Sequence, residues 1–278
     1  MYTRLEIYRK LSTLPYVSVF YKYVRACVVQ SSVALNTDKL LNFYSQFIGE
    51  DDLCFDVGAN IGNRSSIFLK LGARVIAIEP QNDCIRCLKQ KFKNNTKIII
   101  VEKGLNDKDG ELPIYICEAA NTISTFSKKW KTGRFSKYNW SKCEMVKVTT
   151  IDNLIMEFGK PIYCKIDVEG FELQVIKGMT FPIPFISFEF SREFFSDAKC
   201  CIDYLLSLGY NGFNCSLGEE MEMISNNWIP PEELYKKLSL IEDDMLWGDI
   251  YARWCQTAAW ASKQSLAISE TGSRKIGP

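Results

Sequence analysis

The chain has 278 residues, of which 47% are hydrophobic, enough for one large domain with a substantial core. Its 34 Lys and Arg residues nearly balance its 33 Asp and Glu residues, so the net charge gives no reason to expect attraction to nucleic acid or to a membrane surface. Residues 14–35 come nearest to a membrane helix, but Lys22 and Arg25 interrupt them. We therefore expect a cytoplasmic protein without a membrane span.

The sequence contains 11 cysteines and no histidine. Because the cysteines are scattered through expected strands and helices, we interpret them as reduced core thiols. Cys84 and Cys87 are spaced like a metal-binding pair, but on a helix that spacing also marks one buried face, and we expect no metal site. Without histidine, proton transfer must use carboxylates, lysine, tyrosine or cysteine.

Residues 1–49 are expected to form an N-terminal helical cap. Helices are predicted over Tyr2–Leu11, Val17–Val29 and Asp38–Phe47, with many aromatic residues around the second. Packing on the edge of a sheet is the simplest interpretation, and contact with a membrane surface or with a second copy of the chain is the alternative.

Residues 51–80 follow the pattern strand, turn, helix, strand. The apolar run Leu53–Val57 stops at a glycine-rich turn, an amphipathic stretch follows, and a second apolar run, Val75–Ile78, closes on Glu79 and Pro80. This pattern predicts half of a doubly wound sheet, in which ligands bind beyond the carboxyl ends of the strands.

The turn reads G-A-N-I-G and lacks the dinucleotide fingerprint G-x-G-x-x-G. Gly58 and Gly62 allow unusual backbone angles and a close approach of ligand, and free N–H groups are expected at the helix beginning near Asn63. Asp56 precedes the turn, and Glu79 ends the second strand, where a carboxylate can accept hydrogen bonds from ribose hydroxyls. Two acids around a nucleoside pocket suit a cationic ligand without phosphates. S-adenosyl-L-methionine (SAM), with its sulfonium, amino group and ribose diol, fits that description.

The remainder of the chain continues to alternate strand and helix, which predicts a parallel sheet. We expect an α/β fold with a doubly wound, seven-stranded, mostly parallel sheet over residues 50–253, the last strand antiparallel, and an N-terminal helical extension. Residues 254–278 are expected to form a flexible tail. The further strands are predicted over Lys97–Val101, Ile162–Val168, Phe185–Phe190, 210–215 and Met245–Ala252, with helices over 82–94, 150–158, 171–178, 193–208 and from Pro230.

The segment GLNDKDG (104–110) after the third strand is rich in turn-forming residues. Asn106 or Asp107 could reach the edge of an adenine ring, and we favour Asn106. A plain hairpin turn is the alternative for Asp107.

A loop over residues 118–143 separates two segments that look like paired strands, 111–117 and 145–150. The loop mixes the basic residues Lys128, Lys129, Lys131 and Arg134 with the aromatic residues Trp130, Tyr138 and Trp140. Loops of this length are usually functional or disordered. A lid or acceptor wall is favoured, and a plain surface loop and a nucleic-acid contact are the alternatives.

Four motifs occur in order along the chain: DVGANIG (56–62), AIEP (77–80), KIDVEGFE (165–172) and PFISFEF (184–190). As an ordered set they resemble the FkbM family of SAM-dependent methyltransferases, over roughly residues 50–253. The resemblance implies a Rossmann-like class I fold, SAM as cofactor, and O-methylation of a hydroxyl on a sugar, glycolipid or polyketide-like metabolite. It places SAM between the ends of the first and fourth strands, at Asp56, Gly58, Asn60, Gly62, Glu79 and Asp167.

Methyl transfer from a sulfonium is an in-line displacement, and a hydroxyl acceptor also needs its proton accepted. The candidate catalytic residues are Asp167, Glu169 and Glu189, with Lys165 a weaker one. Asp167 can hold the methionine amino group, act as the base or position a water, unless it only caps the next helix. Alternatively, Glu169 only interacts favourably with the positive end of the following helix dipole. Glu189 lies within a strand, where a carboxylate is costly to bury without a partner.

Other functions share parts of this pattern. A nicotinamide oxidoreductase would want the missing glycine fingerprint, and a non-catalytic SAM-binding module would keep the pocket without turnover. An N-methyltransferase typically has Asn/Asp-Pro-Pro-Tyr/Phe, whereas residues 167–170 read Asp-Val-Glu-Gly. The expected partner is a small-molecule or glycan acceptor and not a nucleic acid.

Overall fold

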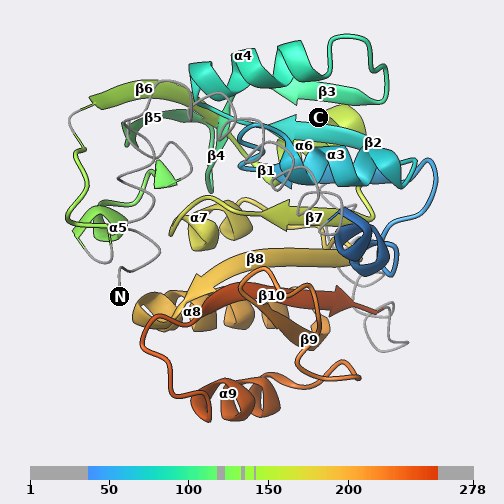
Figure 1. The fold of residues 1–278 in the computed structure, drawn as a ribbon, viewed down its shortest axis with the longest axis vertical. Helices are drawn as coiled ribbons and strands as arrows, with labels where there is room; N and C mark the ends of the chain where they lie inside the picture. The colour runs from blue at the N-terminus through green and yellow to red at the C-terminus, as the bar shows by residue number, and fades with distance from the viewer. Residues whose placement is uncertain (1–36, 118–122, 133–134, 141, 256–278) are drawn as a thin grey trace, which may run out of the picture.

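The structure is a computed structural model that describes residues 37–117, 123–132, 135–140 and 142–255. Its main sheet has seven strands in the order β3-β2-β1-β7-β8-β10-β9 (Figure 1). Strand β10 is antiparallel to both of its neighbours, and the pairs from β3 to β8 are parallel. The predicted doubly wound α/β sheet is confirmed. The strands are β1 (Leu53–Val57), β2 (Arg74–Ile78), β3 (Ile98–Val101), β7 (Tyr163–Ile166), β8 (Phe185–Ser191), β9 (Tyr210–Leu217) and β10 (Trp247–Trp254).

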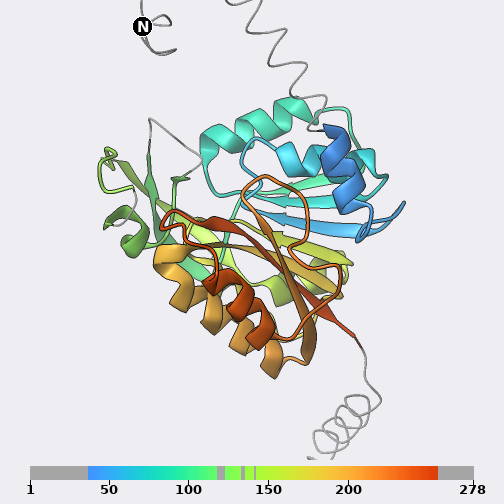
Figure 2. The same ribbon diagram turned by 60° about the horizontal axis from the view of Figure 1, so that its bottom comes forward.

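Helices cover both faces of this sheet, as Figure 2 shows. On one face, residues such as Leu154, Val175 and Leu234 pack into the larger core. On the other face, Phe68 and Leu88 belong to a second core. The helices of the first face are α6 (Ile151–Phe158), α7 (Glu172–Lys177), α8 (Phe195–Ser207) and α9 (Pro231–Ser239), and those of the second are α3 (Asn63–Lys70) and α4 (Asn82–Lys91).

Local sequence explains where several of these elements begin and end. All five residues of β1 are buried, as expected for a central strand covered on both faces. Helix α6 begins after Thr150, whose hydroxyl accepts a hydrogen bond from the Asn153 N–H. Helix α9 begins with Pro231, which lacks the N–H that the first helical turn leaves unpaired.

The described part of the N-terminal segment covers a face of the sheet and not its edge. Residues 37–44 form a helix. The Phe47 ring that follows stacks on Tyr163 and Tyr251, with ring centroids 5.4 and 5.5 Å away. These tyrosines lie in β7 and β10, which are interior strands. The expected helices at 2–11 and 17–29 lie outside the described residues, as does the expected tail beyond Cys255.

A second sheet of three strands lies beside the first, in the order β4-β6-β5. The antiparallel pairing of β5 with β6 confirms the predicted pair of strands, while the short β4, parallel to β6, was predicted only as a turn. The loop between β5 and β6 contains the short helix α5. Residues 118–122, 133–134 and 141 of this region lie outside the described residues. The elements are β4 (Gly104–Leu105), β5 (Gly110–Ile116), β6 (Lys142–Thr149) and α5 (Lys128–Thr132).

The ten described cysteines all carry free thiols. Six of them are buried, but Cys87, Cys143, Cys200 and Cys255 are exposed, which corrects the interpretation of the cysteines as core thiols. In particular, Cys87 does not share the buried face of Cys84, because α4 packs inward through Cys84, Ile85 and Leu88.

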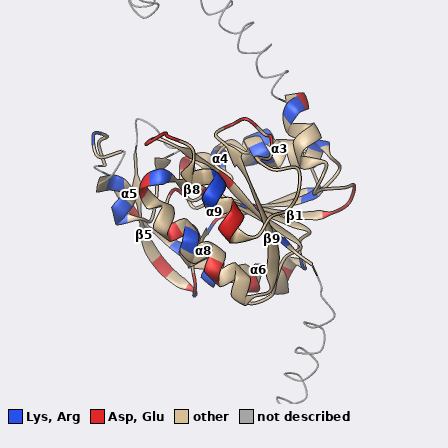
Figure 3. Cartoon of the chain, turned by 90° about the horizontal axis from the view of Figure 1, so that it is seen from below, with Lys and Arg blue, Asp and Glu red and all other residues tan. Residues whose placement is uncertain are grey.

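Basic and acidic residues are intermixed along the elements of the described chain (Figure 3). No helix in the described part of the chain combines the length and the apolar character needed to cross a bilayer.

Candidate active site

A first cavity lies at the carboxyl ends of β1, β2 and β7. This is where a doubly wound sheet places its ligands. Gly58, Asn60, Glu79 and Asp167 are among its lining residues, together with Phe126 from the loop after β5. Four of the residues expected to bind cofactor are therefore brought together.

Glu79 presents a carboxylate that the backbone holds in place. Its Oε2 accepts a hydrogen bond from the Asn60 N–H and its Oε1 accepts one from the Gln81 N–H, each at 2.8 Å. The Gln81 side chain also hydrogen-bonds to this carboxylate, which leaves one of its four lone pairs to accept from a ligand hydroxyl. Burial raises the pKa of Glu79 to about 7, although the two backbone hydrogen bonds act in the opposite direction.

The glycine-rich turn brings the ends of β1 and β7 into close contact. Gly58 has a φ of 78°, and a Cβ atom there would lie 1.8 Å from the carbonyl oxygen of Asp167. Gly62 has a different function. It has a φ of 76°, and a Cβ there would meet the Phe92 ring at 2.5 Å, so this glycine allows α3 to pack near the end of α4. Gly62 is not among the residues that line the cavity.

Asn106 is not brought into the cavity either. Its side chain is buried, and its amide Nδ2 points to the Lys108 carbonyl oxygen at 3.5 Å. The preceding residues, Gly104 and Leu105, do line the cavity. The turn is therefore in the expected place, but Asn106 pairs with β6, through its backbone N–H to Thr149, and turns away.

A second, larger cavity adjoins the first. Gly58, Asn60, Asp167 and Glu169 line both cavities. Asp56, which was expected at the cofactor, lines only the second. The remaining lining residues include two kinds of side chain. One kind is carboxylates such as Glu189, and the other is the aromatic side chains Trp130, Phe135 and Trp247.

Asp56 lies below the surface, where Ser65 Oγ donates a hydrogen bond to its Oδ2 at 2.5 Å. Burial raises its pKa above the ordinary value, while the nearby Lys165 acts to lower it. Lys165 is itself buried, and its Nζ donates to Asp167 Oδ2 at 2.7 Å. Burial acts to lower the pKa of Lys165, but Asp167 and Asp249 outweigh it and raise that pKa above the ordinary value, so Lys165 is a cation.

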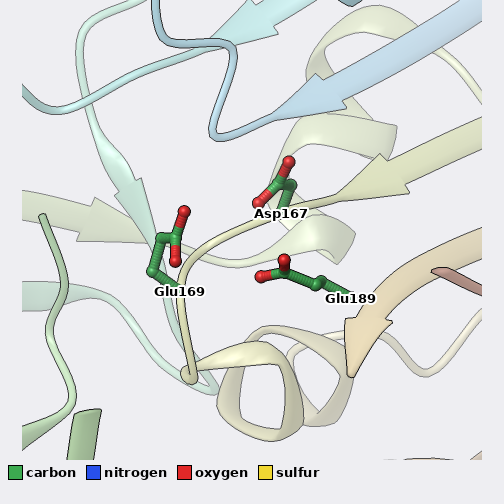
Figure 4. A group of neighbouring side chains, drawn as sticks. All are labelled: Asp167, Glu169 and Glu189. Atoms are coloured by element: carbon green, nitrogen blue, oxygen red, sulfur yellow. The ribbon is translucent and has the colours of Figure 1, made fainter. Parts of the chain in front are cut away.

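Three carboxylates converge where the two cavities meet, and Figure 4 shows them directed toward one another. One oxygen each of Asp167, Glu169 and Glu189 lies within 4.8 Å of the other two. We expected no metal site from the sequence, whereas this group has the composition of one. Burial, with the charges of Glu169 and Asp167, raises the pKa of Glu189 well above its ordinary value.

The loop that carries two of these carboxylates has an unusual backbone. Glu169 and Gly170 both adopt left-handed angles, with φ of 56° and 85°. Thr125 Oγ1 donates to the Glu169 carbonyl at 2.6 Å, and Glu172 Oε1 accepts from the N–H groups of Val168 and Gly170 at 3.3 and 3.1 Å. Sequence reasoning missed Glu172, although it lies in the motif 165–172. A glutamate at the start of a helix, just after a glycine, was the available signal.

Two further charged residues were missed because only the tertiary structure brings them to the site. Asp249 of β10 lies opposite Glu189 of β8 in the antiparallel register. Arg64 of α3 lines the second cavity, and its Nη2 pairs with Glu219 at 2.6 Å.

The sheet order, with its antiparallel strand β10, and the cavity over β1 and β7 define a fold like that of class I methyltransferases. A family model described as Methyltransferase FkbM domain matches residues 56–211. The chain therefore belongs to the FkbM family of SAM-dependent methyltransferases.

One curated relative is the hexuronic acid methyltransferase AglP of Haloferax volcanii, 30% identical over 142 residues, which are 50% of this chain and 54% of that protein. The chain thus matches about half the length of this relative. Among solved structures, a precorrin-6Y C5,15-methyltransferase from Geobacter metallireducens is 13% identical, with a TM-score of 0.42, over 81% of this chain and 88% of that one. Fibrillarin of Aeropyrum pernix, solved with bound SAM, is 12% identical, with a TM-score of 0.40, over 74% and 68% of the two chains.

Proposed function

We propose that this chain, as one domain over residues 50–253, transfers the methyl group of SAM to a hydroxyl of a sugar, glycolipid or polyketide-like acceptor. The observation that carries the proposal is the position of Asp167 and Glu169, which line both cavities. A donor in the first cavity and an acceptor in the second would meet at these two carboxylates.

In this proposal the nucleoside of SAM occupies the first cavity. A ribose hydroxyl donates to Glu79, whose oxygens are already oriented by the Asn60 and Gln81 N–H groups. The methionine part runs past Gly58 toward Asp167, where a carboxylate can hold the amino group or lie near the sulfonium. Asp56 then does not contact SAM. It influences the site electrostatically, through its interaction with the charged pair of Lys165 and Asp167.

The acceptor occupies the second cavity. Trp247, which is 39% exposed, and Trp130 offer apolar faces of the kind that pack on sugar rings, while the carboxylates offer hydrogen-bond acceptors for hydroxyls. The name of the relative from Haloferax volcanii indicates a sugar acid as acceptor for that protein, which supports a sugar-like acceptor here.

The reaction is a direct displacement. The acceptor O–H gives its proton to a carboxylate among Asp167, Glu169 and Glu189 as the oxygen forms a bond to the methyl carbon. The carbon–sulfur bond breaks, its electron pair stays on sulfur, and S-adenosylhomocysteine leaves. A cytoplasmic location is part of the proposal, because free thiols persist in a reducing compartment.

Mass spectrometry tests this function directly. Cell extract is incubated with the protein and SAM labelled in its methyl group, with Glu157→Gln, an exposed carboxylate of α6, as the matched active control. We expect a labelled methyl group on the oxygen of a sugar-containing or polyketide-like product. A label on nitrogen would contradict O-methylation, and SAM binding without any labelled product would indicate a non-catalytic module.

A further inference from the structure

We propose that Asp167, Glu169 and Glu189 bind a divalent cation of the hard, oxygen-preferring class, such as Mn²⁺, Ca²⁺ or Mg²⁺, where the two cavities meet. The two ends of this cluster come from different elements: Asp167 and Glu169 follow β7, and Glu189 lies in the neighbouring β8. Because β7 and β8 are paired in the sheet, they bring the three carboxylates together.

The spacing of the oxygens suits such an ion. Two ligands of one ion lie no further apart than twice the metal–oxygen distance, which is roughly 4.6 to 5.2 Å for Ca²⁺ and about 4.2 Å for Mg²⁺. One oxygen of each carboxylate lies within 4.8 Å of the other two. Small side-chain rotations would bring the three oxygens to the ligand distances of Ca²⁺ or Mg²⁺.

A second observation points to a ligand at this place. Glu189 Oε2 is fully buried and has no hydrogen-bond partner among the described residues, although other atoms of the side chain are partly accessible. A buried carboxylate oxygen without a partner is costly, so such groups normally contact a donor, a water or an ion. Figure 4 shows that the Glu189 carboxylate is directed toward Asp167 and Glu169, which are themselves acceptors and cannot serve as its partner when ionised.

The charge balance of the second cavity agrees with a cation. Five carboxylates but only two basic side chains are among its described lining residues. Both basic groups are already paired, Arg64 with Glu219 at 2.6 Å and Lys165 with Asp167 at 2.7 Å. Lys165 Nζ contacts Asp167 Oδ2, which leaves the other oxygen of this carboxylate for an ion.

The role of this cation in catalysis rests on the proposed function, while its binding does not. An acceptor hydroxyl bound to the ion loses its proton more readily, as metal-bound water does. Because the carboxylates then hold the ion, the proton passes to solvent in place of a carboxylate. The oxygen bonds to the methyl carbon of SAM, and the electron pair of the broken carbon–sulfur bond stays on sulfur. The ion is unchanged at the end of the reaction.

Titration with Mn²⁺, followed by electron paramagnetic resonance of the free ion, tests the site on the full chain with S-adenosylhomocysteine present. We expect one Mn²⁺ per chain, at least tenfold weaker binding by Glu189→Gln, and competition by Ca²⁺. The matched control is Glu111→Gln, an exposed carboxylate of β5 that lines neither cavity. Binding equal to the wild type in Glu189→Gln would overturn the assignment.

The wild-type chain supplies a test that does not depend on the folding of any variant. If it binds neither Mn²⁺ nor Ca²⁺ up to about 1 mM, the weak end of protein Ca²⁺ sites, the cation site is wrong. A parallel titration with SAM in the presence of EDTA separates the two proposals. SAM binding and methyl transfer without any cation binding would overturn the cation site but leave the proposed function. Cation binding without methyl transfer would support the cation site but overturn the proposed function.

Discussion

The carbonyl oxygen of Asp167 occupies the space that a Cβ atom on Gly58 would need, only 1.8 Å away. Gly58 also has a φ of 78°, which side chains other than glycine rarely adopt. The turn after β1 can contact the loop after β7 only because residue 58 has no side chain. Together the two segments form the wall that both cavities share.

Gly58→Ala should therefore lower the free energy of unfolding by at least about 2 kcal/mol, from the left-handed backbone and from the clash with a main-chain atom. Urea unfolding measures the change. Gly218→Ala is the matched control, because Gly218 also has a positive φ, of 49°, but its Cβ would lie 3.7 Å from Trp247. Equal losses in the two variants would show that the contact with Asp167 has no energetic weight.

Glu172 should make stability depend on pH. Burial raises its pKa from 4.5 to about 7 in the folded chain. Between pH 4.5 and about pH 7, Glu172 keeps its proton in the folded chain but has released it in the unfolded chain. The contribution of Glu172 to stability is therefore fully present below about pH 4.5 and is lost as the pH rises through about 7. The slope is at most about 1.4 kcal/mol per pH unit. Urea unfolding across this range should show a smaller loss of stability in Glu172→Gln than in the wild type, and parallel curves would refute the raised pKa.

Asp167→Asn should impair turnover more than SAM affinity. Asparagine keeps the shape of the side chain but cannot accept a proton or hold an ion, so we expect kcat to fall by about 100-fold or more. The Kd for SAM should change by less than about tenfold, since Glu79 and the backbone of the turn are intact. Asp83→Asn, an exposed aspartate of α4, is the control in the same kinetic and binding assays. An unchanged kcat would remove Asp167 from the chemistry.

Trp247→Ala should weaken acceptor binding and leave SAM binding alone, because Trp247 lines the second cavity and not the first. Loss of an aromatic face against a sugar ring is worth about 1 kcal/mol, so KM for the acceptor should rise about fivefold to tenfold. Steady-state kinetics with the identified acceptor measure it. Phe181→Ala removes an exposed aromatic residue outside both cavities, and an equal KM in the two variants would place the acceptor elsewhere.

The sequence patterns predicted most of the fold, because each depends on neighbours along the chain. Strand β1 has the predicted bounds, Leu53–Val57, since an apolar run bounded by a charged pair and a glycine turn has few alternatives. The ordering of β1, β2 and β7 follows from the doubly wound pattern. Glu79 and Asp167 come to one cavity for the same reason: each follows a parallel strand whose carboxyl end faces the same edge.

The remaining features depend on contacts between distant segments. Asp249 comes opposite Glu189 only because β10 inserts between β8 and β9. Phe47 packs on the face of the sheet because Tyr163 and Tyr251 offer their rings there, and no local pattern near Phe47 indicates this. Asn106 turns away from the cavity because its backbone N–H bonds to β6.

The central claim is that the cavity around Glu79 binds SAM, and isothermal titration calorimetry of the intact chain with SAM tests it most directly. We expect one SAM per chain with a micromolar Kd, and binding at least about tenfold weaker in Glu79→Ala, because a charge-assisted hydrogen bond to a ribose hydroxyl contributes about 1.5 to 3 kcal/mol. A folded wild-type chain that takes up no SAM, or a Glu79→Ala variant that binds it as tightly as the wild type, would contradict the account.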